Sequence, residues 1–203
     1  MLPKQYFDRM DESDDERFYA APRLVVHIDE YAIARTIALF REYLPAGGTI
    51  LDLMSSWRSH LPPDVAYNEV VGLGMNATEL HENPQLDRFI VQNLNAKAQL
   101  PFTDSSFDAA IVTVSVQYLT NPIAVYAEVG RVLRLGAPFL TIFSNRMFAS
   151  KAVAVWHSLD DAGHAQLVAS YYQLAGCFER IEAFDCSPVH GDPVFLVVGY
   201  RAA

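Results

Sequence analysis

The chain has 203 residues, the length of one domain with a short extension, and its 51% hydrophobic and 19% charged residues are typical of a folded globular protein. The net charge of −9 argues against a nucleic-acid-binding surface, because phosphate binding needs clustered cations. No apolar run approaches the roughly 18–20 residues that span a bilayer, and the N-terminus turns acidic where a signal peptide is apolar, so we expect a cytoplasmic protein without a membrane partner.

Residues 1–22 are predicted to form an acidic, flexible N-terminal arm, and residues 23–203 the folded domain. Between Asp8 and Glu16 the chain carries six acidic residues and a single arginine. A charge run of this kind is usually solvated. We therefore expect the arm to be poorly ordered or only loosely docked.

From residue 28 onward, the apolar pattern predicts alternating helices and strands. Apolar residues at helical spacing predict a helix over 28–44, with Asp29 as its N-cap. The predicted strands are 49–53, 69–73, 89–92, 108–114, 139–143, 180–186 and 194–200, and the further helices are 76–86, 123–133, 148–157 and 160–175. This alternation predicts an α/β fold, a Rossmann-like three-layer α/β/α sandwich around a mostly parallel, seven-stranded sheet. The turn at 190–193 predicts a hairpin, which makes the last strand antiparallel.

The functional site is expected at one edge of this sheet. In open parallel sheets, ligands bind outside the carboxyl ends of the strands, near the point where the strand order reverses. The loops that follow Leu53, Leu73, Gln92 and Val114 are therefore predicted to surround a single crevice.

Two stretches of sequence are typical of a known family. Residues 100–108 read LPFTDSSFD and lead into the fourth strand, and residues 131–137, RVLRLGA, end the helix before the fifth. Together with the closing hairpin, this pattern resembles the class I S-adenosylmethionine-dependent methyltransferases of the small methyltransferase-domain type, over about residues 30–200. The resemblance implies S-adenosyl-L-methionine as cofactor and a small-molecule methyl acceptor, and leaves the acceptor and the oligomeric state open.

The loop after the first strand departs from the family pattern, in which an Asp is followed by three alternating glycines. Aligning Asp52 with that acid places Met54, Ser56 and Arg58 at the glycine positions. Glycine there lets the backbone approach the cofactor closely. Either Ser55 and Ser56 supply hydroxyls and backbone donors in a loop of different shape, or the cofactor site has been lost.

The end of the second strand is the other departure. The family carries an acidic residue there that accepts hydrogen bonds from the ribose hydroxyls, and Gly74 stands in its place. Met75 is expected to pack on the adenine, and Asn76 or Glu79 to reach the ribose if the loop bends. On this reading, Gly74→Asp should strengthen cofactor binding.

The resemblance also implies contacts from the next two loops. After the third strand, Asn95, or else Asn93, would meet the adenine amino group beside Leu94, although both asparagines also suit a turn. After the fourth strand, Gln117 and Tyr118 would face the methyl group and the acceptor; the alternative is a helix cap and a packed aromatic ring. The implied cofactor-binding set is Asp52, Ser55, Ser56, Trp57, Gly74, Met75, Leu94, Asn95 and Gln117.

Catalytic candidates are few, because methyl transfer from a sulfonium mainly requires alignment, and a base is needed only when the acceptor must lose a proton. We consider Tyr118, His60, which follows the first loop, and His27, in a segment that in the family folds over the cofactor as a lid. No set of histidines and cysteines has the spacing of a metal site. The sequence thus predicts a methyltransferase acting on a small molecule; the alternative is a non-catalytic methyltransferase-like binding or partner protein that has lost the cofactor site.

Overall fold

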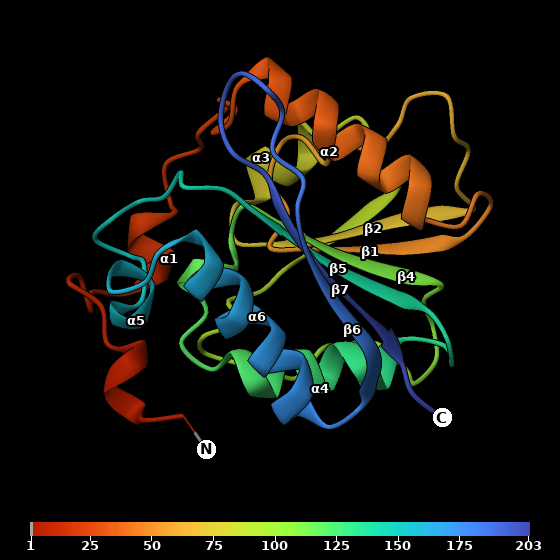
Figure 1. Cartoon of the computed structure of the whole chain (residues 1–203). Helices are drawn as coiled ribbons and strands as arrows, with labels where there is room; N and C mark the ends of the chain where they lie inside the picture. The colour runs from red at the N-terminus through yellow and green to blue at the C-terminus, as the bar shows by residue number, and fades with distance from the viewer. Residues whose placement is uncertain (1) are drawn as a thin grey trace.

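The computed structural model describes residues 2–203 and shows a seven-stranded sheet between two helical layers (Figure 1). The strands are β1 (Thr49–Leu53), β2 (Glu69–Gly74), β3 (Arg88–Val91), β4 (Ala109–Thr113), β5 (Pro138–Phe143), β6 (Phe178–Asp185) and β7 (Phe195–Arg201). The helices are η1 (Lys4–Phe7), α1 (Asp15–Phe18), α2 (Glu30–Tyr43), α3 (Ala77–His81), η2 (Val116–Tyr118), α4 (Pro122–Val132), α5 (Ala154–His157) and α6 (Asp161–Ala175).

The strand order is β3-β2-β1-β4-β5-β7-β6. Strands β1 to β5 are parallel, and β7 runs antiparallel to both β5 and β6. The predicted fold class is therefore confirmed, including the antiparallel last strand. Because the chain moves outward from β1 on one side and from β4 on the other, the order reverses between these two strands, and a crevice opens at their carboxyl ends.

Each face of the sheet buries a separate apolar layer. Helix α2 lies on one face, where Leu39 and Phe40 belong to the same core cluster as Ile111 of β4. Helices α4 and α6 lie on the other face (Figure 1). There the hydroxyls of Tyr126 and Tyr172 both meet the Thr141 hydroxyl, at 2.8 and 2.9 Å, so these three buried hydroxyls are hydrogen-bonded to one another.

Two connections contain less helix than the sequence predicts. The helix expected over 76–86 ends at His81, shortly before Pro84, and the one expected over 148–157 begins only at Ala154. No helix links β1 to β2 across 54–68, a stretch that includes Pro62 and Pro63. Of these irregular segments, the start of the β1–β2 connection and residues 146–148 line a cavity at the carboxyl ends of the strands.

Strand β3, predicted over 89–92, is partly exposed to solvent. Phe89 is 36% exposed and Val91 52% exposed. The reason is topological, because β3 forms the edge of the sheet and pairs only with β2.

The LPFTDSSFD stretch acts as scaffold. Arg131 of α4 donates hydrogen bonds to the carbonyl oxygens of Leu100 and Phe102, at 3.0 and 2.8 Å. At the end of the stretch, the Asp108 carboxylate accepts a hydrogen bond from the Thr49 backbone nitrogen at 2.9 Å. The stretch therefore joins α4 to β1 and sets the position of β4.

None of the helices within residues 2–203 combines the length and the apolar character needed to cross a membrane. Within the same range, no three His, Cys, Asp or Glu side chains are grouped so as to hold a metal ion.

Candidate functional site

A cavity of about 360 Å³ lies at the carboxyl ends of β1, β2 and β4. Its volume falls within the range of small-molecule sites, roughly 300–1,000 Å³. Eleven of the predicted site residues line it: His27, Asp52, Ser55, Ser56, Trp57, His60, Gly74, Met75, Leu94, Asn95 and Tyr118. The crevice predicted from the strand ends is thus present, while the roles of these residues stay predictions.

Gln117 is the predicted site residue that does not reach the cavity. Its side chain is fully buried, and Nε2 donates to the carbonyl oxygens of Val114 and Arg146, at 3.3 and 3.2 Å. The amide turns inward because the backbone at Val114 adopts a left-handed conformation, with φ of 51°, and exposes its carbonyl to Gln117. Gln117 therefore supports the loop after β4, and its side chain does not line the cavity.

The loop after β1 keeps the backbone of a glycine turn without the glycine. Met54, at the first glycine position of the family pattern, has a φ of 54°. Beyond this turn, the Ser55 and Ser59 hydroxyls both donate to Oδ2 of Asp52 at 2.6 Å. The Ser55 hydroxyl expected to face a cofactor is thus used to hold the loop against Asp52.

Asp52 is a carboxylate inside the domain. It is 3% exposed, and burial raises its pKa to about 6, although the two serine hydroxyls favour the charged form. The side chain therefore titrates within the physiological range, at the wall of the cavity.

Gly74 is needed for close packing between two strand ends. A Cβ on Gly74 would lie 2.2 Å from the carbonyl oxygen of Ser55, and that residue's backbone nitrogen donates to the carbonyl of Leu73 at 2.9 Å. An acidic side chain at position 74 therefore does not fit this loop. The prediction that Gly74→Asp strengthens binding therefore requires the Ser55 backbone to move.

Glu79, in the helix that follows β2, has its carboxylate at the cavity wall. Its Oε2 accepts a hydrogen bond from the Ser56 hydroxyl at 2.6 Å, and its Oε1 accepts one from the Arg23 backbone nitrogen at 2.7 Å. Asn76 caps α3 and accepts from the Glu79 backbone nitrogen at 3.1 Å, which positions this turn of helix. Glu79 thereby lies at the cavity wall between the β1 loop and the N-terminal arm.

Asn95 lines the cavity, but its amide already has partners. Nδ2 donates to the Asp15 carboxylate and to the Tyr118 carbonyl, both at 2.9 Å, and Oδ1 accepts from the Thr120 backbone nitrogen at 2.8 Å. Asn93 accepts from the Asn95 backbone nitrogen at 2.9 Å, as in an Asx turn. The structure therefore favours the turn interpretation for both asparagines over a direct adenine contact.

The end of β4 presents polar atoms that lack a partner. Thr113 and Ser115 line the cavity, and within residues 2–203 neither side-chain hydroxyl finds a hydrogen-bond partner. Buried polar atoms are normally paired, so two orphans at one cavity wall indicate a ligand with polar atoms of its own.

The catalytic candidates lie around the same wall. The Tyr118 hydroxyl accepts a hydrogen bond from the Phe148 backbone nitrogen at 2.8 Å, and burial raises its pKa. Burial and the charge of Arg58 lower the pKa of His60 to about 4. Both side chains are therefore neutral at pH 7, and His60 at that pKa is a weak base.

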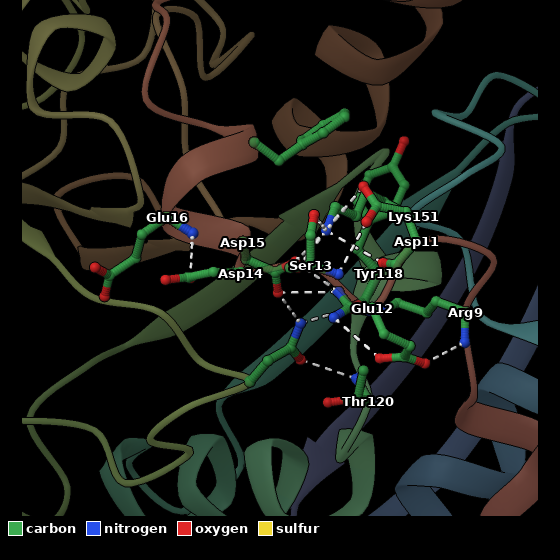
Figure 2. Close-up of polar contacts among 12 residues, drawn as sticks. Arg9, Asp11, Glu12, Ser13, Asp14, Asp15, Glu16, Tyr118, Thr120 and Lys151 are labelled. Atoms are coloured by element: carbon green, nitrogen blue, oxygen red, sulfur yellow. Dashed lines mark hydrogen bonds and ion pairs between the residues drawn. The ribbon is translucent and has the colours of Figure 1, made fainter.

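The N-terminal arm forms the outer wall of the cavity, which the sequence did not indicate. Lys151, with no exposed side-chain surface, lies 3.2 Å from the Asp15 carboxylate and donates to the Ser13 carbonyl at 2.6 Å. Arg9 approaches the same carboxylate at 2.7 Å (Figure 2). Asp15 is only 4% exposed, so the acidic run is not simply solvated.

The end of the arm and the segment that joins it to α2 cross the cavity mouth. Asn76 Nδ2 donates to the carbonyl of Tyr19 at 2.9 Å, and Trp57 Nε1 donates to the carbonyl of Val25 at 2.8 Å. The family resemblance implied a lid in the segment that contains His27, whereas the docking of residues 1–22 was not predicted, because contacts such as Asp15–Lys151 and Asn76–Tyr19 join positions far apart in the chain.

Comparison with known proteins agrees with the geometry. Residues 59–141 match the family model described as the methyltransferase domain. This match confirms the resemblance inferred from LPFTDSSFD, and it begins after the loop at 54–58. No curated protein matches the sequence.

Many solved structures share the fold. A chain from the complex between the Haloferax volcanii Trm112 methyltransferase activator and a protein described as a methyltransferase is 14% identical, with a TM-score of 0.66 over 86% of this chain and 91% of that chain. Phosphoethanolamine N-methyltransferase 2 of Haemonchus contortus, in complex with S-adenosyl-L-methionine, is 10% identical, with a TM-score of 0.63 over 84% of this chain and 53% of that chain. The (4+2)-cyclase SpnF is 15% identical, with a TM-score of 0.62 over 83% and 81%. These likenesses show the fold alone.

Proposed function

We propose that this chain, which has the fold of the class I S-adenosylmethionine-dependent methyltransferases, binds S-adenosyl-L-methionine in the cavity and methylates a small-molecule acceptor. The observation that carries the proposal is the cavity itself, which lies where the strand order reverses and is lined by three carboxylates, those of Asp15, Asp52 and Glu79, and by two unpaired hydroxyls. The domain match over residues 59–141 supports the reaction class.

The residues of the cavity fit such a cofactor. Glu79 takes the place of the missing acid at position 74 as acceptor for the ribose hydroxyls, since its carboxylate already accepts one hydroxyl hydrogen bond, from Ser56. Met75 and Leu94 supply apolar surface for the adenine ring. Thr113 and Ser115 are free to hydrogen-bond the ligand at the end of β4.

When bound, the cofactor supplies a methyl group that is already activated on sulfur. Transfer would form a bond from that methyl carbon to the acceptor atom and break the carbon–sulfur bond, with the electron pair left on sulfur and the acceptor's proton passed to a base or to water. The protein's part is to align the two reactants and exclude water. Tyr118 and His60 line the cavity in their neutral forms and act by positioning.

The size of the cavity restricts the acceptor. About 360 Å³ lies near the lower end of the volumes of small-molecule sites. With the arm in place, a cofactor leaves little further room, so the acceptor is a small molecule or the arm moves aside to admit it.

Titration calorimetry with S-adenosylmethionine and S-adenosylhomocysteine tests the proposal. We expect both to bind at one site with dissociation constants of about 10 μM to 1 mM, weaker than with a complete glycine loop. Glu79→Gln should weaken binding about 10-fold or more through loss of a charged hydrogen-bond acceptor. Glu82→Gln, which changes an exposed carboxylate next to α3, should have no effect. Absence of binding of either ligand at millimolar concentration would overturn the proposal in favour of a non-catalytic binding protein.

A further inference from the structure

Three of the four arginines that line the cavity have their charge compensated or hydrated. Arg9 pairs with Asp15 at 2.7 Å, and Arg146 pairs with Asp192 at 2.8 Å. Arg58 is exposed, and it donates to backbone carbonyls from the solvent side. None of these three cations needs a charged ligand.

Arg23 is the fourth, and its charge has no such partner. Its backbone nitrogen donates to Glu79, and Nη2 donates to the carbonyl oxygen of Phe18 at 2.8 Å. Nη1 is buried and finds no acceptor within residues 2–203. The guanidinium also forms no ion pair with any carboxylate in that part of the chain. A partly buried cation of this kind is costly unless a counter-charge arrives.

Aromatic rings hold this guanidinium in place. Its central carbon lies 4.6 Å from the ring centre of Phe18, 5.3 Å from that of Phe148 and 5.7 Å from that of Tyr19. Ring faces attract a cation more weakly than a carboxylate does, but they restrict the plane of the guanidinium. A guanidinium oriented in this way is suited to a carboxylate, which it can bind with two parallel hydrogen bonds.

The positive charge acts on the cavity. Burial is the main cause that lowers the pKa of His27, and the charge of Arg23 lowers it further, against the opposing effect of Glu79. His27 lies beside Phe148, with ring centroids 5.1 Å apart. Arg23 therefore presents its charge at the wall formed by the arm and the loop after β5.

We infer that Arg23 is an anion subsite that pairs with a carboxylate of the bound ligand. Two ligands of the proposed reaction can supply that group, namely the amino-acid end of the cofactor and a carboxylate on the acceptor. The first source rests on the proposed function, and the second does not require the cofactor.

The experiment compares matched ligands that differ in the carboxylate, by titration calorimetry on the full chain. S-adenosylhomocysteine is compared with 5′-methylthioadenosine, which lacks the amino-acid end, and benzoate is compared with neutral benzamide. The proteins are the wild type, Arg23→Gln, Arg23→Lys and the control Arg17→Gln, which changes an exposed arginine six residues earlier in the chain.

If the cofactor supplies the carboxylate, Arg23→Gln weakens the binding of S-adenosylhomocysteine about 10- to 100-fold and leaves the binding of 5′-methylthioadenosine unchanged. If the acceptor supplies the carboxylate, Arg23→Gln weakens the binding of benzoate and leaves the binding of benzamide and S-adenosylhomocysteine unchanged. In either case Arg23→Lys retains part of the affinity and Arg17→Gln retains all of it.

Three results would overturn the inference. Arg23→Gln could lower the affinity for charged and neutral ligands equally, which would show that Arg23 only packs against its neighbours, or it could change the affinity for no ligand. The third result is a wild-type protein that binds neither S-adenosylhomocysteine nor benzoate. If the wild type binds benzoate in a way that depends on Arg23 but binds neither adenosine ligand, the proposed cofactor is refuted and the anion subsite at Arg23 is supported.

Discussion

The carbonyl oxygen of Ser55 occupies the space in which a side chain on Gly74 would begin. The ideal Cβ of residue 74 lies 2.2 Å from that oxygen, and it also lies 3.1 Å from Cδ2 of Leu80. The first contact is with backbone, which cannot rotate away as a side chain can. The ends of β1 and β2 therefore depend on glycine at this position.

Gly74→Ala should lower the free energy of unfolding by about 1–3 kcal/mol, because the added methyl group overpacks the β1–β2 contact. Urea denaturation measures this change. Gly74→Asp should be at least as destabilising and should weaken S-adenosylhomocysteine binding. Tighter binding of S-adenosylhomocysteine by Gly74→Asp, together with weaker binding by Gly74→Ala, would contradict this expectation. It would show that the loop after β1 can move and that an acid at position 74 accepts the ribose hydrogen bonds.

The left-handed backbone of Val114 stores strain beside the cavity, since its φ is 51° and its side chain is β-branched. Val114→Gly should relieve about 1–2 kcal/mol of that strain while loosening the turn that carries Ser115 and Tyr118. We expect ligand affinity to fall. Ser105→Gly is the matched control, because Ser105 has a φ of 54° but is exposed and lies outside the cavity. Equal ligand affinities for the two variants would contradict a role of this turn in binding.

Asp52 should make the protein less stable as pH rises from about 4 to 6. The folded protein holds the proton to a pKa of about 6, against 3.8 for an unperturbed carboxyl, so it binds more protons than the unfolded chain in this window. Two pKa units correspond to about 3 kcal/mol lost above pH 6. Asp52→Asn should flatten this dependence and raise stability at pH 7, as measured by urea denaturation from pH 4 to 8. Asp64→Asn, at an exposed carboxylate whose pKa the Arg41 hydrogen bond lowers, should leave that loss of stability in place. A wild-type stability that rises through the whole window would contradict the assignment.

Lys151 should hold the N-terminal arm against the domain. Lys151→Met leaves the buried Asp15 carboxylate without one of its cations, a change that costs about 3–5 kcal/mol. Limited trypsin digestion should then cut at Arg17 faster than in the wild type. Arg41→Met removes an exposed ion pair with Asp64 and should cost less than about 1 kcal/mol. If the two variants lose the same small amount of stability, the Lys151 cluster does not anchor the arm.

The sequence by itself determined the sheet and the place of the site. Strand patterns and turn residues act over a few positions, so the seven strands and the antiparallel β7 could be predicted from nearby residues. Because parallel strands end at a common edge, the same prediction brought Asp52, Gly74 and Tyr118 to one cavity.

Only the tertiary structure decided how the cavity is walled and which side chains are free within it. Asp15 meets Lys151 from 136 positions away, and Glu79 meets Arg23 from 56 positions away. Ion pairs and hydrogen bonds of this kind depend on the distance between atoms in space and leave no periodic pattern in the sequence. For that reason the sequence predicted a solvated acidic arm, although Asp15 of this arm is buried and lines the cavity.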